Sequence, residues 1–351
     1  MNRSSLNIGT WIYCESPGEE SKYPQVGGSS SSIQFQAVYW RCVVVYFACS
    51  VRNNPTANHL LFTNVHQIPD LGTFKTGQFL AQLGVKVISL PFTYQTPVGY
   101  FGAWRNQFYI FDVLKYLTQN CNSNDCYIIL DSDCLWVNSA DRIVADIQKY
   151  GLLTYDMSYP VGKLINGLTQ LDMKKIYEEL DGKTLDEAPT YFGGEWFGAT
   201  GQEIKKVSAE FEPIWEFCLS RFANNQPKFN EEAHALSYIY HKLGYATRTA
   251  NPYIRRIWTS PQLYGARPED MNLHVWHTPT EKRYGLKRLF KQVINLNSPF
   301  WNLPLGQPFI QYLARYLGIP KPTLLKVILD RFDDKISGLR KRLSFTRRSG
   351  Q

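Results

Sequence analysis

The stretch from Tyr127 to Trp136 places the strongest constraint on the fold, because it joins an apolar run to two acidic residues. The run Tyr127–Leu130 shows no polar alternation, which is typical of a strand buried on both faces of a parallel sheet covered by helices. Asp131 and Asp133 follow at once, and residues two apart in extended chain point to the same side. Open α/β sheets bind ligands beyond the carboxyl ends of their strands. The sequence therefore predicts a binding site here.

Two carboxylates that converge at the mouth of an apolar strand favour a cation between them. Without one they would repel each other and lose hydration. Hard carboxylate oxygens suit Mn²⁺ or Mg²⁺, which keep open positions for phosphate oxygens. The segment resembles the Asp-x-Asp motif of glycosyltransferases with the A-type nucleotide-sugar fold (GT-A). The resemblance implies a metal that holds the diphosphate of a nucleotide sugar, with a UDP-sugar as first choice, whereas a solvated surface turn is the alternative reading. It also implies that Asp133 binds the metal, while Asp131 contacts the ribose or the sugar and can share the metal.

Predicted strands and helices alternate on the N-terminal side of this motif. We expect strands at 7–13, 59–65 and 85–90, separated by helices at 35–51 and 73–83. This alternation predicts an α/β fold with a doubly wound, mainly parallel, Rossmann-like sheet. The helix at 35–51 carries a single charge, Arg41, near its middle. A buried charge disfavours the alternative that this segment spans a membrane.

Length and composition predict one large catalytic domain with an extension. The 351 residues are 44% hydrophobic and 15% aromatic, which is enough for a sizeable core. We expect a GT-A catalytic domain at 1–298, with a nucleotide-sugar donor half at 1–138 and an acceptor half at 139–298. A helical, basic C-terminal extension is expected at 299–351.

Cysteine usage and charge bear on location and partners. The seven cysteines are scattered and form no CxxC pair, which argues against a disulfide framework or a zinc cluster and favours a reducing compartment. No basic and apolar leader opens the sequence, so we expect a cytoplasmic protein. Residues 321–351 hold nine basic and three acidic residues, and the rest of the chain is nearly neutral. This distribution disfavours nucleic acid as a partner.

The GT-A resemblance implies roles in donor binding for three residues. In that fold the end of the first strand meets the nucleotide base and ribose, which implies roles for Tyr13 and Glu15. A basic residue on the helix before the motif commonly contacts the diphosphate or sugar, and Arg105 falls in the first turn of a helix expected to begin at Trp104. A guanidinium binds phosphate oxygens in pairs. A surface ion pair is the alternative for Arg105.

A glycine-rich aromatic segment lies between 191 and 200. Its three glycines, Gly193, Gly194 and Gly198, would let the backbone approach a ligand closely, although a tight structural turn needs such glycines too. Glu195 lies among them, and we interpret it as a candidate catalytic carboxylate in a sugar-binding or acceptor-binding position. Thr200 is placed to cap the helix that follows.

Two more acidic residues open a helix that is predicted to begin at Asn230. Acidic residues in a first turn have an ordinary explanation, because they complement the helix dipole. Yet the order of motifs from 104 to 240 resembles glycosyltransferase family six, the retaining blood-group-type enzymes. By position, Glu231 matches the Asp and Glu232 the Glu of that family's His-Asp-Glu segment. The resemblance implies that Glu232 faces the anomeric carbon, but the residues between the motifs differ.

A histidine ends the last predicted strand, at 272–279. The glycogenin-like family presents a C-terminal histidine as third metal ligand and a downstream lysine to the diphosphate, and His277 and Lys282 occur in that order. The glycine and Lys-Pro-Trp of that family are missing. A neutral imidazole beside two carboxylates makes a credible metal site, with His274 as the fallback ligand. A purely structural histidine is the alternative.

The chain changes character beyond Pro299. Helices are predicted at 307–317 and 324–345, and the second carries apolar residues every three or four positions opposite basic ones. We favour packing of this helix on the catalytic domain. The alternative is peripheral contact of 321–348 with the inner, anionic face of a membrane, beside a lipid-linked acceptor.

The sequence therefore predicts a metal-dependent hexosyltransferase that moves a sugar from a nucleotide diphosphate to a hydroxyl of a glycan or lipid-linked acceptor. In a retaining reaction, which we favour, Glu232 would stabilise or bond the sugar; in an inverting one, Glu232 or Glu195 would take the acceptor's proton. A nucleotidyltransferase also uses paired aspartates, but Cys14–Pro17 lacks the glycine-rich basic loop expected there. A membrane-associated binding protein without activity is the other alternative.

Overall fold

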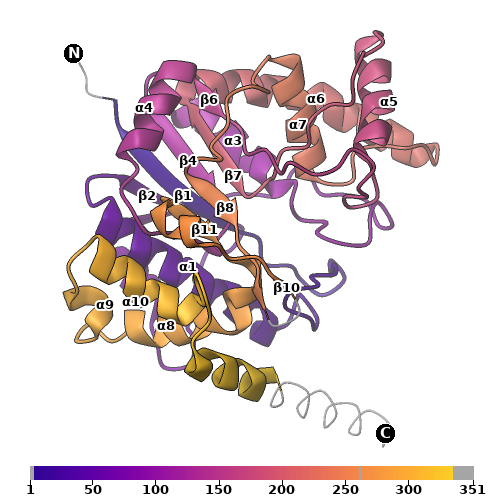
Figure 1. The fold of residues 1–351 in the computed structure, drawn as a ribbon. Coiled ribbons are helices and arrows are strands. Elements are labelled where there is room, and N and C mark those ends of the chain that lie inside the picture. Colours follow the sequence, from indigo (N-terminus) through magenta and orange to yellow (C-terminus); the bar gives the residue numbers. More distant parts are fainter. Residues whose placement is uncertain (1–3, 261–262, 335–351) are drawn as a thin grey trace, which may run out of the picture.

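A six-stranded sheet forms the centre of the molecule in the computed structural model, which describes residues 4–260 and 263–334. The strand order is β3-β2-β1-β4-β7-β6. The parallel strands β1 to β4 are Leu6–Ile12, Asn58–Thr63, Val85–Ser89 and Cys126–Leu130. β7 (Trp196–Thr200) runs antiparallel to β4 and to β6 (Leu152–Leu153). The predicted doubly wound, mainly parallel α/β sheet is therefore confirmed (Figure 1).

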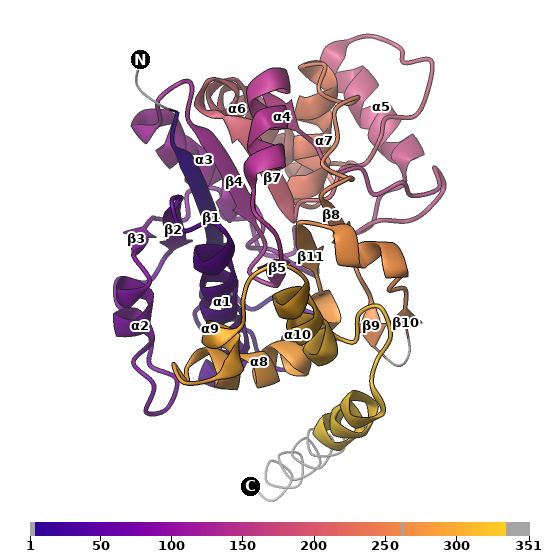
Figure 2. The same ribbon diagram turned by 60° about the vertical axis from the view of Figure 1, so that its left-hand side comes forward.

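Helices cover both faces of this sheet, which explains why β4 shows no polar alternation. Ile128 and Leu130 belong to the core on one face, while Tyr127 and Ile129 belong to the core on the other. The first core takes residues from α1, α2 and α4, which span Ile33–Asn53, Thr76–Gln82 and Asp141–Tyr150. The second takes residues from α3, α5, α6 and α7, which span Tyr109–Asn120, Gln170–Asp181, Gly201–Ala223 and Glu232–Lys242 (Figure 2).

A small second sheet lies beyond the carboxyl end of β4. Its strands have the order β5-β11-β8 and span Cys134–Trp136, Val275–His277 and Ile254–Arg256. β9 (Thr259–Ser260) and β10 (Leu263–Tyr264), which follow β8, pair antiparallel with each other. The 3₁₀ helices η1 (Pro268–Asn272) and η2 (Pro279–Arg283) flank β11. The chain therefore returns to the end of β4 after it has built the second half of the large sheet.

The C-terminal part is helical, as predicted. Its helices α8 (Gly285–Val293), α9 (Pro299–Asn302) and α10 (Gln307–Leu317) contribute to the same core as α1. Residues 324–334 form a further helix, which we call the C-terminal helix, and the remainder of the helix predicted to reach 345 lies outside the described residues. The boundary expected between 298 and 299 and the division at 138 stay predictions.

None of the helices in the described part of the chain combines the length and the apolar character that a membrane crossing requires.

The predicted start of α3 is wrong by five residues, and that of α7, expected at Asn230, is wrong by two. α3 begins at Tyr109 and not at Trp104. Before it, the chain forms turns, in which the Gln107 N–H donates to the Trp104 carbonyl at 3.2 Å. The backbone of Trp104 has a φ of 47°, in the left-handed region that a helix does not use. Arg105 therefore lies on a loop and not in the first turn of a helix.

Candidate functional site

Strand register brings residues far apart in the sequence to the carboxyl end of β4. Asp131–Asp133 form the turn between β4 and β5, and the Asp131 N–H donates to the Glu195 carbonyl at 3.2 Å. β11 pairs antiparallel with β5 and parallel with β8, so Cys134, His277 and Arg256 lie in one row. The small second sheet thus brings the His277 imidazole to the two aspartates and the Arg256 guanidinium to Glu195.

Asp131, Asp133 and His277 form a compact group. One potential ligand atom from each lies within 4.8 Å of the other two. His277 Nε2 is 3.1 Å from Asp133 Oδ2 and 4.0 Å from Asp131 Oδ2. Lys282 Nζ also binds Asp133 Oδ2. The Asp131 side chain is 31% exposed, whereas those of Asp133 and His277 are almost fully buried, so Asp131 forms the open side of the group.

The charges of this group depend strongly on one another. Burial and the neighbouring Asp133 raise the pKa of Asp131 to about 6. Burial also disfavours charge on Asp133, but Lys282 and His277 outweigh it and hold the pKa of Asp133 well below its usual range. Burial likewise opposes charge on His277, yet Asp133 and Glu195 raise its pKa to about 9. A cation bound at this place would therefore displace the proton of His277.

The donor set fits a divalent metal ion. Two carboxylates and one imidazole nitrogen match the oxygen-rich sites that hold Mn²⁺ or Mg²⁺. His277 Nδ1 lies 2.9 Å from Glu195 Oε1, and a carboxylate on the far ring nitrogen is the usual way in which a protein orients a metal-binding histidine. His274 is not part of the group, because its Nδ1 lies 2.6 Å from the Ser139 carbonyl.

Glu195 is held by a cation as well as by the imidazole. Arg256 Nε and Nη2 donate to its two carboxylate oxygens at 2.8 and 2.7 Å, which is the paired geometry that guanidinium groups favour. Arg256, followed by His277, outweighs burial and holds the pKa of Glu195 well below its usual range. A Cβ on Gly193 would lie 2.4 Å from Glu195 Oε2. That glycine is required because the backbone passes so close to the carboxylate.

A second pair of carboxylates, Glu231 and Glu232, faces the same cavity. Glu231 is the N-cap of α7, and its carboxylate accepts from the Tyr191 hydroxyl at 2.8 Å and from the Asn166 amide. Glu232 Oε2 is buried and accepts no hydrogen bond within the described protein. A Cβ on Gly194 would lie 2.1 Å from Glu232 Oε1. Gly193 and Gly194 thus leave room for the carboxylates of Glu195 and Glu232.

Burial dominates the acidity of this second pair. It raises the pKa of Glu231 to about 7. It raises the pKa of Glu232 well above the usual value, and the charges of Glu231 and Asp131 raise it further. Two buried carboxylates with so few cationic neighbours retain a proton between them near neutral pH. Such a pair can accept a proton or stabilise a positive charge during a reaction.

All these groups line one cavity of about 340 Å³, a size typical of small-molecule sites. Its aromatic lining supplies flat apolar faces, on which a base or a sugar ring can stack. The aromatic residues are Trp11, Tyr13, Tyr23, Phe35, Tyr39, Trp104, Tyr159, Tyr191 and Trp258. The cavity therefore joins an acidic, metal-compatible floor to aromatic walls.

Two of the three residues expected to bind the donor, Tyr13 and Glu15, line the cavity but already have hydrogen-bond partners. Tyr13 lines the cavity, and its hydroxyl donates to the Glu19 carboxylate at 3.2 Å. Glu15 also lines it, but its carboxylate accepts from the Ser21 N–H at 3.0 Å, the Ser21 hydroxyl at 2.8 Å and the Tyr23 hydroxyl at 3.0 Å. Its oxygens thus hold the loop that follows β1.

Arg105 is not among the residues that line the large cavity. Its Nη2 donates to the Thr96 carbonyl at 3.0 Å, and it borders a separate small hollow beside Tyr13 and Glu15. Asn106 and Gln107 of the same loop line the large cavity in its place. Arg105 lies on a turn and not on a helix, and its side chain is held at the Thr96 carbonyl while its neighbours on the turn line the cavity.

Sequence analysis missed Arg256, which lines the cavity and neutralises Glu195. It lies in the short run Ile254–Ile257, in which Arg255 is equally basic but pairs with Asp270 at the opposite side of the strand. Alternation along a strand separates the two arginines. A strand assignment for this run was the signal that could have found it.

Comparisons with known proteins were made at the level of sequence and of structure. No protein-family model and no curated protein matches the sequence. Among solved structures, mouse xyloside xylosyltransferase 1 in its apo form is similar with a TM-score of 0.44 at 8% identity, over 78% of this chain and 97% of that chain. The bifunctional glycosyltransferase WbbM in its apo form has a TM-score of 0.48 at 7% identity, over 85% of this chain and 50% of that chain. The galactosyltransferase LgtC, in complex with donor and acceptor sugar analogs, has a TM-score of 0.46 at 11% identity, over 82% and 94%. These structural neighbours are all glycosyltransferases.

Proposed function

We propose that this chain is a metal-dependent glycosyltransferase that moves a sugar from a nucleotide diphosphate to an acceptor hydroxyl. One observation carries the proposal: Asp131, Asp133 and His277 offer converging metal ligands at the floor of a cavity that Lys282 and Arg256 also line. Carboxylates, imidazole and cations in this arrangement match a metal-bound diphosphate. The aromatic walls match a base and a sugar.

Each residue of the floor has a definite task in this proposal. Asp131, Asp133 and His277 would hold Mn²⁺ or Mg²⁺, which neutralises the leaving nucleoside diphosphate. Glu195 orients His277, and Arg256 keeps Glu195 ionised. Lys282 now neutralises Asp133, and it can turn to a phosphate when a metal ion takes over that carboxylate. A contact between Arg105 and the donor would require its loop to move, because its side chain bonds to the Thr96 carbonyl outside the cavity lining.

The second carboxylate pair supports Glu232 as the catalytic residue. Its free Oε2 is buried in the cavity. Glu195, the other candidate, is engaged by Arg256 and His277 on both oxygens, which makes it a poor base. In a retaining reaction, which we favour, Glu232 stabilises or bonds the anomeric centre; in an inverting one it takes the acceptor's proton.

The proposed substrates follow from the same cavity. A UDP-sugar is the donor that we favour, with base and ribose near Trp11 and Tyr13, and the acceptor is a glycan or a lipid-linked glycan. The seven cysteines are all free thiols in the structure, in keeping with a proposed cytoplasmic location.

The deciding experiment measures donor binding and turnover with and without metal. We expect Mn²⁺ to enable release of the nucleoside diphosphate from one member of a panel of nucleotide sugars, and to make that donor raise the melting temperature. The Asp133→Asn variant should lose the metal-dependent shift. The Asp141→Asn variant, altered at an exposed carboxylate outside the cavity, should keep it.

Two outcomes would favour the other classes. Release of pyrophosphate from nucleoside triphosphates would indicate a nucleotidyltransferase. Donor binding without turnover, whatever the metal, would indicate a binding protein without activity.

A further inference from the structure

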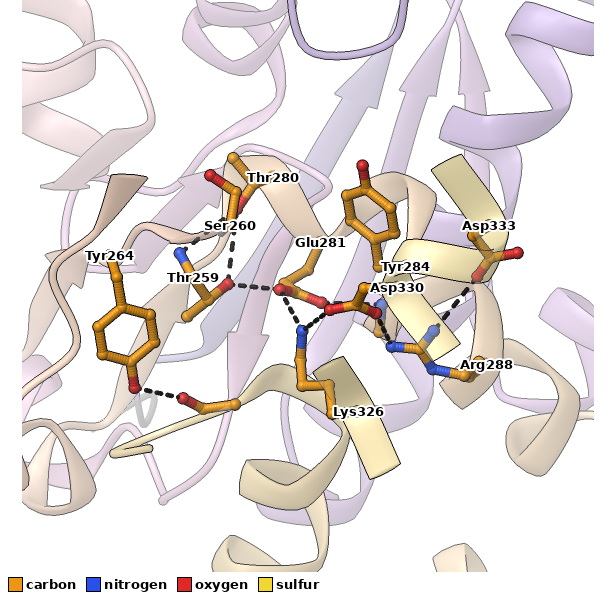
Figure 3. Close-up of polar contacts among 12 residues, drawn as sticks. Thr259, Ser260, Tyr264, Thr280, Glu281, Tyr284, Arg288, Lys326, Asp330 and Asp333 are labelled. Atoms are coloured by element: carbon orange, nitrogen blue, oxygen red, sulfur yellow. Dashed lines mark hydrogen bonds and ion pairs between the residues drawn. The ribbon is translucent and has the colours of Figure 1, made fainter. Parts of the chain in front are cut away.

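The C-terminal helix is joined to the body of the protein by its polar side. A cluster that we call the polar clasp consists of Glu281, Arg288, Lys326, Asp330 and Asp333 (Figure 3). Lys326 Nζ lies 2.9 Å from Glu281 Oε1 and 2.6 Å from Asp330 Oδ2. Arg288 pairs with Asp330 and, at 3.2 Å, with Asp333. Because Glu281 belongs to η2 and Arg288 to α8, the clasp ties this helix to two elements of the body.

An amphipathic pattern usually predicts that the apolar side of a helix packs on the protein, but here the charged side does. Lys326 and Asp330 are both 3% exposed, and they occupy the side of the helix that faces the protein. Sequence analysis favoured packing on the catalytic domain, and the helix does pack, but through its charged residues. Buried charges are stable only when they are paired, and here each has a partner of opposite sign.

The opposite side of the helix presents an apolar surface. Five large apolar residues are exposed there: Leu324 (77%), Leu325 (66%), Ile328 (46%), Leu329 (38%) and Phe332 (63%). Their spacing puts them on one stripe of the helix. Scattered exposed apolar residues need no explanation, but a contiguous group marks an interaction surface.

The charge beside this surface is positive. All three acidic residues of 321–351 face the body, since Asp333 also pairs with Lys287 at 2.7 Å and Asp334 bonds to the Tyr284 hydroxyl. Residues 321–351 hold nine basic residues. Of the three in the described part of this segment, Lys326 belongs to the clasp, while Lys321 and Arg331 are exposed. Two copies of such a surface would repel each other, whereas an anionic surface would attract it.

We propose that the apolar stripe of 324–334 is a docking surface for an anionic lipid bilayer, and that the polar clasp is the device that turns this stripe outward. Apolar side chains would enter the acyl boundary, and the flanking arginine and lysine side chains would meet lipid phosphates. The proposal does not depend on sugar transfer, since it concerns a surface outside the cavity. It would, however, deliver the cavity to lipid-linked acceptors.

The test measures sedimentation of the full chain with lipid vesicles. We expect binding to vesicles of phosphatidylcholine mixed with phosphatidylglycerol, weakening as salt increases. The triple variant Leu325→Glu, Ile328→Glu and Phe332→Glu should bind at least about tenfold more weakly. The matched control Leu171→Glu, Leu296→Glu and Leu305→Glu adds the same charge at three other exposed positions, and it should bind more tightly than the stripe variant.

Three results would overturn the proposal. Equal binding of both triple variants would mean that net charge alone attracts the protein. Equal binding to pure phosphatidylcholine would remove the role of anionic lipid. A dimer in sedimentation-velocity runs that only the stripe variant dissociates would assign the stripe to a second copy of the chain.

Folding and activity serve as separate readouts. All three stripe positions are exposed, so the variant should keep the wild-type melting temperature. Turnover of a nucleotide sugar with a water-soluble acceptor should be unchanged, which distinguishes failure of docking from failure of the proposed function.

Discussion

The carboxylates in the cavity are of two kinds: some contact a cationic side chain, and others do not. Asp133 and Glu195 each contact a cation. Glu232 has an unpartnered carboxylate oxygen although it is buried. Uncompensated burial of a carboxyl group is costly for stability. It is tolerated most readily where the group works on a substrate.

Replacement of Glu232 by Gln tests its assignment at the residue scale. The amide keeps the shape of the side chain but can neither accept a proton nor stabilise a positive centre. We expect kcat to fall by roughly 10² to 10⁴-fold, with little change in donor affinity measured by thermal shift. The Glu216→Gln variant, on the exposed side of α6, should have wild-type kinetics. A fall in donor affinity alone would assign Glu232 to binding.

The same pair predicts a pH dependence of turnover. Catalysis needs Glu232 ionised, and burial together with Glu231 raises its pKa. We therefore expect kcat to fall on acidification and to rise with pH, with a midpoint above the range in which a glutamate usually ionises. In the Glu231→Gln variant one negative neighbour is lost, so the acid limb should move to lower pH. An unmoved limb would assign the titration to another group.

At the scale of elements, β11 and η2 link the cavity to the C-terminal helix. β11 ends in His277, and η2 carries Lys282 toward the cavity next to Glu281, which belongs to the polar clasp. Two neighbouring residues of η2 thus make different contacts: Lys282 binds Asp133 in the cavity, and Glu281 binds Lys326 of the C-terminal helix. The C-terminal helix consequently braces the segment that supplies a cation to the metal site.

A double-mutant cycle on Lys326 and Glu281 measures how much this ion pair contributes to the free energy of unfolding. Lys326→Met leaves the buried Glu281 carboxylate without its cation, and loss of one partner from a buried pair costs about 3–5 kcal/mol. With Glu281→Gln the charge is absent, so the double variant should be more stable than additivity predicts, by about 1 kcal/mol or more. Urea unfolding provides the free energies.

The exposed pair Lys75 and Asp70 is the matched control for that cycle. Its side chains are 61% and 39% exposed, so Lys75→Met and Asp70→Asn should couple by less than about 1 kcal/mol. Full additivity at Lys326 and Glu281 would mean that the clasp contributes no more than a surface pair.

For the whole molecule, buried neutral histidines make stability depend on pH. His59 belongs to β2 and is buried, with Nε2 at 2.9 Å from the hydroxyl of Ser50 on α1. Burial lowers its pKa to about 4. A lowered pKa means that its contribution is complete above about pH 6.5, the value in an unfolded chain, and is lost as the pH falls toward 4.

Urea unfolding at pH 7 and pH 4.5 measures this contribution. The wild type should lose about 2 to 3 kcal/mol more on acidification than the His59→Gln variant, which cannot take up a proton. The His66→Gln variant, at an exposed histidine, should lose as much as the wild type. The prediction would be contradicted by equal losses in all three proteins.

The sequence by itself determined the local elements and the aspartate pair. The unalternated run before Asp131 predicted a strand buried on both faces, because apolar side chains on opposite faces need cover on both. The histidine at the end of the last strand was also predicted, and His277 does join Asp131 and Asp133. The strand and the aspartate pair depend on residues that are neighbours in the chain, whereas the meeting of His277 with the aspartates depends on the pairing of β11 with β5.

Tertiary structure alone decided which distant residues meet. Arg256 joins Glu195 only because β8 pairs with β11 in one register. Arg105 lies outside the cavity lining because its side chain bonds to the Thr96 carbonyl, on a loop where a helix was predicted, and α3 begins five residues later than its pattern suggested. The C-terminal helix likewise packs by its charged face, since Glu281 and Arg288 offer partners that no local pattern contains. Periodicity reports which residues share a face, but what that face meets depends on contacts between segments far apart in the sequence.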